Sequence, residues 1–123
     1  MKLTNGEIML AKEGIDTLTQ MKFPVEVSYK LAKLASAVRD EHRAISGVKD
    51  GLVIKYGVVN EGGVTEVTPT NPRFPDFIRE FNTLMEIETE IVATPVKLPL
   101  EVDGKPLEVE PRLLISLTKF IDV

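Results

Sequence analysis

Five basic side chains on one expected helix are the residues best suited to hold a ligand. They are Lys30, Lys33, Arg39, Arg43 and Lys55. Lys30 and Lys33 are one helical turn apart, and Arg39 and Arg43 are four residues apart, so each pair shares a helix face. Arginine binds phosphate through two parallel hydrogen bonds. We interpret the set either as a solvated helix face or as an anion-binding pocket formed where this helix meets a second copy of the chain.

The single histidine and a row of glutamates are the other side chains that could do chemistry. His42 could serve as a general base or a metal ligand. A site needs several convergent groups, however, which favours a partly buried position on a helix face. Glu86, Glu88 and Glu90 alternate along an expected strand and would project from one face. Such a row binds a cation or, as we favour, stays solvated and discourages edge pairing.

The sequence lacks the common motifs of catalysis. It has no cysteine, which excludes disulfides, thiolate zinc sites and cysteine nucleophiles. Gly57, Gly62 and Gly63 are not followed by the Gly-Lys-Ser/Thr of a phosphate-binding loop, and no Gly-x-Ser-x-Gly is present. We therefore expect no catalytic residue, no metal and no cofactor. A carboxylate-based metal nuclease is the alternative that we favour least.

Composition limits the classes of partner. The 123 residues suffice for one domain, which we take to span 1–123. The net charge of −4 and the 6% aromatic content argue against binding to bulk nucleic acid. No stretch approaches the roughly twenty apolar residues of a membrane span. Glu7 and Lys12 interrupt the apolar run that an export signal needs. We expect a cytoplasmic location without membrane contact.

The first half of the chain indicates two helices. Thr4 and Glu7 form a capping-box pattern, and apolar residues follow at helical spacing at Ile8, Ala11, Ile15 and Leu18. Residues 23–27 alternate between apolar and polar, which predicts a short strand, and Ser28 would cap the next helix. That helix is predicted over 29–56. Its near-heptad apolar seam consists of Leu31, Leu34, Val38, Ile45, Val48 and Leu52.

The long helix is expected to pair with a third one. Gly47 and Gly51 lie four apart in it and would permit close approach of another backbone. Residues 57–71 predict a flexible hairpin or loop, and Pro72 is expected at the first position of the third helix. Pro75 falls in the first turn, where proline is tolerated. The two helices would form a long antiparallel hairpin.

The last third predicts strands and a short helix. Residues 87–93 alternate with a period of two. Asp103-Gly104 indicates a tight turn that pairs Leu100 with Leu107 and Leu98 with Val109. A final helix begins at Pro111, with Leu113, Leu114, Leu117 and Phe120 on its buried side. The expected class is α+β: a long antiparallel helical hairpin, two shorter helices and a small antiparallel β-sheet or hairpin.

Several segments resemble one protein family. In chain order they are MKLTNGEI, FPVEVSYKLAKLASAV, IKYG and FNTLMEIETEI. Together they resemble an uncharacterised family of small proteins from tailed bacteriophages of Gram-positive and gut bacteria. The proline-rich residues 95–111 depart from the family pattern. No catalytic motif accompanies the family, so the resemblance implies an origin: a phage gene product that acts in an infected cell or in a virion.

These observations leave two main hypotheses. The first is a non-enzymatic binding protein, a homo-oligomer in the host cytoplasm, that sequesters a nucleotide-type signal of antiphage defence or binds a host protein. The heptad-like helix would provide the assembly surface, and the five basic residues would contact a small anionic ligand. The second is a structural or assembly component of the virion, such as a connector or tail-associated protein.

Overall fold

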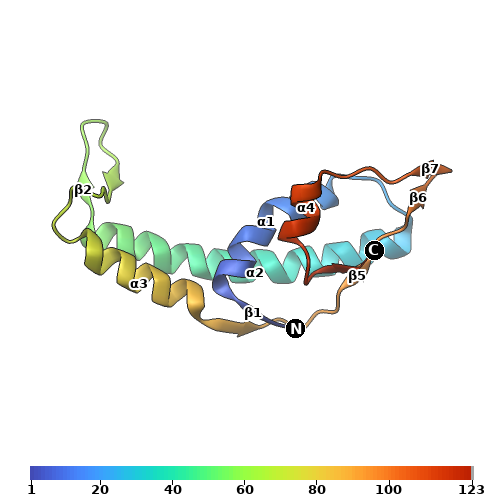
Figure 1. The fold of residues 1–123 in the computed structure, drawn as a ribbon, viewed down its shortest axis with the longest axis horizontal. Coiled ribbons are helices and arrows are strands. Elements are labelled where there is room, and N and C mark those ends of the chain that lie inside the picture. Colours follow the sequence, from blue (N-terminus) through green and yellow to red (C-terminus); the bar gives the residue numbers. More distant parts are fainter. Residues whose placement is uncertain (123) are drawn as a thin grey trace.

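One long helix connects two unequal parts of the molecule. The computed structural model describes residues 1–122, and its helix α2 (Val25–Tyr56) runs along the whole length (Figure 1). One part, which we call the body, contains residues 1–44 and 88–122. The other, which we call the arm, contains residues 45–86: the end of α2, a hairpin and helix α3 (Phe74–Glu86). The expected α+β class with a long helical hairpin is confirmed.

The predicted capping box starts the first helix. Thr4 Oγ1 accepts a hydrogen bond from the Glu7 amide at 3.1 Å, and Glu7 Oε1 accepts one from the Thr4 amide at 3.0 Å. Helix α1 (Asn5–Thr19) follows. Strand β1 (Lys2–Thr4) precedes it and pairs antiparallel with β4 (Glu88–Glu90). Sequence analysis missed β1 because three residues are too few to show a period.

The prediction of a strand at residues 23–27 is wrong, because α2 already begins at Val25. Pro24 occupies the N-cap, and the Ser28 hydroxyl donates to the Phe23 carbonyl at 3.1 Å instead of capping an amide. Proline suits a helix start because its missing N–H would have no partner there. Valines in a first turn also avoid the crowding against a preceding turn that disfavours them inside a helix.

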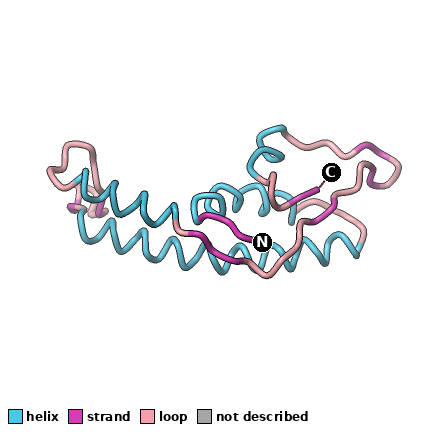
Figure 2. The backbone as a smooth tube through the Cα atoms, turned by 60° about the horizontal axis from the view of Figure 1, so that its bottom comes forward, coloured by secondary structure: helices cyan, strands magenta, loops and turns pink. Residues whose placement is uncertain are grey.

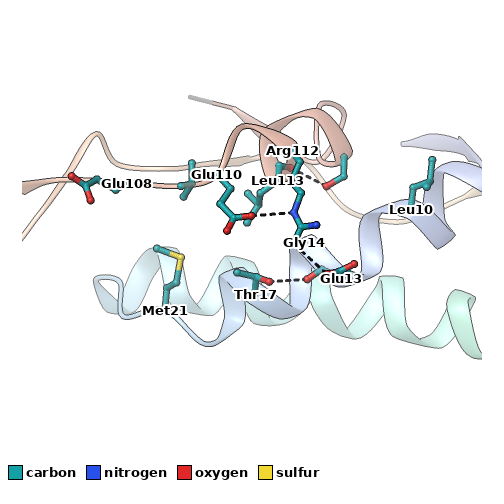
Figure 3. A pocket seen from close by; sticks show the side chains of 11 residues that line it. Leu10, Glu13, Gly14, Thr17, Met21, Glu108, Glu110, Arg112 and Leu113 are labelled. Atoms are coloured by element: carbon teal, nitrogen blue, oxygen red, sulfur yellow. Dashed lines mark hydrogen bonds and ion pairs between the residues drawn. The ribbon is translucent and has the colours of Figure 1, made fainter.

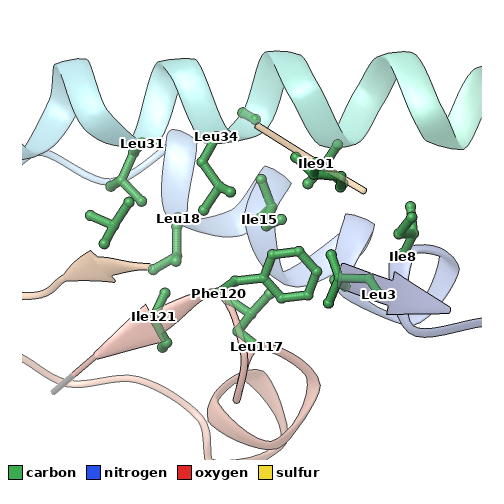
Figure 4. Packing of buried hydrophobic residues seen from close by; sticks show 14 of the residues in the cluster. Leu3, Ile8, Ile15, Leu18, Leu31, Leu34, Ile91, Leu117, Phe120 and Ile121 are labelled. Carbon is green, nitrogen blue, oxygen red and sulfur yellow. The ribbon is translucent and has the colours of Figure 1, made fainter. Parts of the chain in front are cut away.

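The body has a dense apolar core between α1, α2 and the C-terminal residues (Figure 4). Side chains from distant parts of the sequence meet there, and the most buried include Leu3, Ile8, Leu18, Leu34, Leu117 and Phe120. Helix α4 (Pro111–Ser116) packs closely on α1 at Gly14. A Cβ added to Gly14 would lie 3.0 Å from Ser116 Oγ and 3.1 Å from Leu117 Cγ. The glycine therefore permits this helix contact.

The predicted tight turn is confirmed. Asp103 and Gly104 both have positive φ, 54° and 75°, and connect β6 (Glu101–Val102) to β7 (Lys105–Pro106). The Leu107 amide donates to the Leu100 carbonyl at 2.8 Å, as predicted. The backbone pairing does not continue to residues 98 and 109. Leu98 instead donates to the Asp122 carbonyl at 2.8 Å, where β5 (Val96–Lys97) pairs in parallel with β8 (Ile121–Asp122).

The arm is the predicted helical hairpin. Figure 2 shows α3 running back along α2, and a short hairpin of β2 (Val58–Val59) and β3 (Thr65–Glu66) lies at the tip. Helix α3 begins two residues after Pro72. The Asn71 side chain accepts from the Arg73 amide at 2.8 Å, which holds the chain in a turn first. Pro75 does lie in the first turn.

Two further expectations are corrected. Glu86 ends α3, so the predicted glutamate row on a strand is reduced to Glu88 and Glu90. Gly47 and Gly51 approach no other backbone within residues 1–122, since a Cβ added at either would meet no atom within 4 Å. The glycine with the nearest neighbours is Gly57, where α2 ends.

Candidate functional site

The five basic residues do not form one site within a single chain. The rise of 1.5 Å per residue places Lys55 about 37 Å along α2 from Lys30. Nine residues separate Lys30 from Arg39, which turns Arg39 to the opposite side of the helix at about 100° per residue. The structure therefore distributes the five side chains over three regions: a groove near the start of α2, a hollow beside α1, and the arm.

Arg39 serves to join two helices. Its Nη2 and Nε lie 3.0 and 3.2 Å from Oδ1 of Asp16 on α1. Lys12 Nζ lies 2.7 Å from the other carboxylate oxygen. Lys12, and then Arg39, hold the pKa of Asp16 below its ordinary value. The Asp16 carboxylate thus bridges two cations where α1 crosses α2.

Lys55 stabilises the arm. Its Nζ lies 3.2 Å from Glu80 Oε2 on α3 and 5.0 Å from the centre of the Tyr56 ring. Arg73 Cζ approaches the same ring at 4.5 Å. Glu80 raises the pKa of Lys55, while the Tyr56 hydroxyl and then Lys55 lower the pKa of Glu80. These contacts hold α3 against the end of α2.

Arg43 lies beside His42 in an open hollow of about 540 Å³. His42 Nδ1 is 3.4 Å from Ser46 Oγ, and the imidazole is half-buried. Burial and then the positive charge of Lys12 lower the pKa of His42, which favours the neutral ring. Across residues 1–122, no three side chains of the types that bind metals gather into a possible site.

Lys30 and Lys33 line the groove that we take as the candidate ligand site. It has a volume of about 670 Å³ and lies between α2 and the irregular segment 91–95 that follows β4. Its lining is Met1, Tyr29, Lys30, Lys33, Leu34, residues 90–94 and Val96. Lys33 Nζ lies 5.6 Å from the centre of the Tyr29 ring. Sequence analysis found the two lysines but missed Tyr29 and the opposite wall, since nothing in the sequence places residues 91–96 beside α2.

A third hollow lies between α1 and α4 (Figure 3). Its volume is about 440 Å³, and apolar Leu10 and Met21 share its lining with several glutamates. Arg112 is the positively charged residue of the lining. Arg112 Nε lies 3.0 Å from Glu110 Oε2, and Nη2 lies 3.8 Å from Glu13 Oε1. Because two carboxylates already contact this guanidinium, the hollow is a less suitable anion site than the groove.

The arm presents apolar surface that the chain itself leaves accessible. Helix α3 carries its large apolar side chains on one face. Leu84 is buried, whereas Phe74, Phe77, Ile78, Phe81 and Met85 are half-buried. Phe77 forms an edge contact with Tyr56 at 6.3 Å and stacks on Phe81 at 6.0 Å. Further apolar side chains on α2 and the hairpin are exposed: Val48, Ile54, Val58, Val59 and Val64.

Comparisons with known proteins return no relative. The chain matches no protein-family model, no characterised protein and no solved structure. Among the helices of residues 1–122, none combines the length and apolar character needed to cross a membrane.

Proposed function

We propose that the protein is a non-enzymatic binding protein that works as a homo-oligomer assembled through its arm. The observation that carries the proposal is the apolar face of α3, on which Leu84 alone of the large side chains is buried. Two paired helices leave part of a wide apolar face uncovered, and helical proteins commonly cover such faces in bundles of four. A second arm would supply the other two helices.

The exposed side chains of the arm fit this assembly. Val48 and Ile54 on α2 are 54% and 72% exposed, and Val58 and Val59 at the tip are 61% and 68% exposed. Exposed apolar side chains are thus frequent along residues 48–59, and a patch of such side chains would mark an interaction site. The resemblance to phage proteins suggests the setting: the host cytoplasm, where the assembly would sequester a nucleotide-type signal or bind a host protein.

Size-exclusion chromatography with light scattering tests the assembly. The wild-type chain is expected to elute as an oligomer at micromolar concentration. The variant Val48→Glu/Ile54→Glu is expected to shift toward the monomer, because charges would have to be buried between the arms. The matched control is Leu10→Glu/Ile115→Glu, which changes two body side chains that are 73% and 76% exposed. It should keep the wild-type mass.

A wild-type protein that stays monomeric up to about 100 µM, far above the Kd of a stable complex, would refute assembly. An oligomer that persists in Val48→Glu/Ile54→Glu would instead refute the role of the arm. Native mass spectrometry of protein purified from bacterial cells supplies the second test. A co-purified species of a few hundred daltons supports ligand sequestration, and a bare oligomer favours capture of a protein.

A virion structural or assembly component is the second candidate, and the β2–β3 hairpin favours it. This hairpin projects beyond the helices at the tip of the arm (Figure 1) and exposes Val58, Val59 and Val64. Such an extension suits insertion into a neighbouring subunit of a ring. Mass spectrometry of purified phage particles separates the two candidates: presence of the protein in particles supports the virion role, and absence refutes it.

A further inference from the structure

We propose that the groove between α2 and residues 91–96 binds a small ligand that combines a planar ring with one or two phosphate groups, the chemistry of a nucleotide. The inference rests on the binding function proposed above, but it does not require assembly. The sequence suggested an anion pocket shared with a second copy. In the structure, the opposite wall comes from the same chain.

The two lysines provide the phosphate contacts. Lys30 Nζ is 3.5 Å from Glu26 Oε1, and both side chains are exposed, 58% and 83%. Such a pair is weak, so a phosphate can replace the carboxylate. Lys33 makes no ion pair within residues 1–122 and lies over the Tyr29 ring at 5.6 Å. One helical turn separates the lysines, which lets both reach one diphosphate.

The rest of the groove suits a ring. Its floor consists of Leu34, Ile91 and Val96, which are 1%, 3% and 3% exposed. Tyr29 stands at the edge with its ring 63% exposed. Aromatic side chains stack on bases without regard to sequence. A base placed against Tyr29 would cover apolar surface that water now contacts, on Tyr29 itself and on Val92, which is 100% exposed. The groove volume of about 670 Å³ is typical of small-molecule sites.

The rim limits the number of phosphates. Glu90 lies in the lining and is exposed. A carboxylate accepts hydrogen bonds from sugar hydroxyls but repels additional negative charge. The N-terminal ammonium of Met1, also in the lining, lies 3.3 Å from Glu90 Oε1 and offsets its charge. Two lysines then remain for phosphate, so the groove favours a monophosphate or diphosphate over a triphosphate. This preference separates nucleotide recognition from nonspecific attraction of anions, for which the most highly charged ligand binds best.

Amide NMR spectra of the full chain, titrated with ADP, test the inference. The expected shifts lie in residues 29–34 and 91–96. Lys30→Gln/Lys33→Gln should raise the Kd for ADP about tenfold or more. Tyr29→Leu should raise the Kd for ADP and leave the Kd for pyrophosphate unchanged. The control Lys22→Gln/Lys105→Gln removes the same charge from two exposed lysines outside the groove and should bind ADP like the wild type.

Four results would overturn the inference: shifts confined to other residues, adenosine binding as tightly as ADP, ATP binding more tightly than ADP, or dodecanoate, an anion without a ring, binding more tightly than ADP. An oligomer that binds none of these probes refutes the groove and leaves assembly standing. A monomer that binds ADP with the predicted shifts refutes assembly and supports the groove.

Discussion

The body and the arm share one helix but bury it to different degrees. In the body, α2 is covered by α1, by β5 and by the segment after β4, and Leu31, Leu34 and Val38 are at most 2% exposed. In the arm, α3 and the β2–β3 hairpin contact it, and Val48 and Ile54 remain more than half exposed. Helix propensity cannot account for this difference along a continuous helix. The number of packed neighbours decides it.

The two parts also use different contacts. The body excludes water from aliphatic side chains drawn from the whole sequence. The arm uses a row of aromatic rings and charged groups that stack on them, with Lys55 and Arg73 on the Tyr56 ring. The body thus buries its apolar side chains within one chain, whereas the arm leaves several of its own exposed.

The largest expected effect contrasts one ring in each part. Phe120→Ala should lower the free energy of unfolding by about 3–5 kcal/mol, because Phe120 is 2% exposed in the core. Phe77→Ala should cost about 1–2 kcal/mol, since Phe77 is only partly buried. Urea unfolding of both variants, at a concentration at which each is monomeric by light scattering, measures the difference. Equal losses would contradict the contrast between body and arm.

The next effect is confined to the tip of the arm. A Cβ at Gly57 would collide with the Val53 carbonyl and would lie 2.8 Å from Thr65 Cγ2 and 2.9 Å from the Glu66 carbonyl. Gly57→Ala should therefore cost about 1–3 kcal/mol and loosen the β2–β3 hairpin. Hydrogen exchange should speed up at residues 53–66 and stay unchanged in α1. The control Gly62→Ala has its nearest neighbour at 3.4 Å and should change little.

Some features of the fold could be predicted from the sequence and others could not. The capping box, the helical hairpin and the Asp103-Gly104 turn depend on neighbouring residues, so local rules were sufficient to find them. The β1–β4 and β5–β8 pairs join distant segments of three residues or fewer, which carry no periodic signal. Only one wall of the groove could be predicted, for the same reason. Lys30 and Lys33 are neighbours on one helix, whereas the opposite wall consists of residues 91–96, which are distant in the sequence.

A smaller effect concerns the start of the body. Thr4→Ala removes the cap of α1 and should cost about 1 kcal/mol, whereas Thr83→Ala, in exposed α3, should cost less. Glu7 adds a pH dependence. Hydrogen bonds from Lys119, at 2.6 Å, and from Thr4 hold the pKa of Glu7 below its ordinary 4.5. The charged Glu7 carboxylate therefore stabilises the fold fully above that pH. This stabilisation is lost as the pH falls through the lower pKa that Glu7 has in the folded state.

Urea unfolding at several pH values checks this sign. Wild-type stability should decline below about pH 5, where carboxylates begin to take up protons, and the decline should be shallower in Glu7→Gln. A Glu7→Gln profile parallel to the wild type would show that the carboxylate has an ordinary pKa in the folded protein. Glu13→Gln is the matched control, since Glu13 is exposed and lies on the same helix.

The smallest effect is expected at the surface of the arm. Both side chains of the Lys55–Glu80 ion pair are partly exposed. Lys55→Gln breaks this pair, so the free energy of unfolding should change less than in any variant above. Its reverse, Glu80→Gln, should behave in the same way, and the double variant should equal either single one. A loss above about 1 kcal/mol, equal in both single variants and in the double variant, would show that this pair holds α3 in place.

The parallel pair of β5 and β8 also determines when the protein can fold. Phe120 and Ile121 enter the core beside segments that are synthesised much earlier, and β1 must wait for β4. The arm needs no such delay, because α2 and α3 are joined by a short hairpin and make local contacts, which form fast. During translation the arm would therefore be complete while the body still exposes its core. A nascent chain would present the exposed apolar side chains of its arm before its own fold is finished.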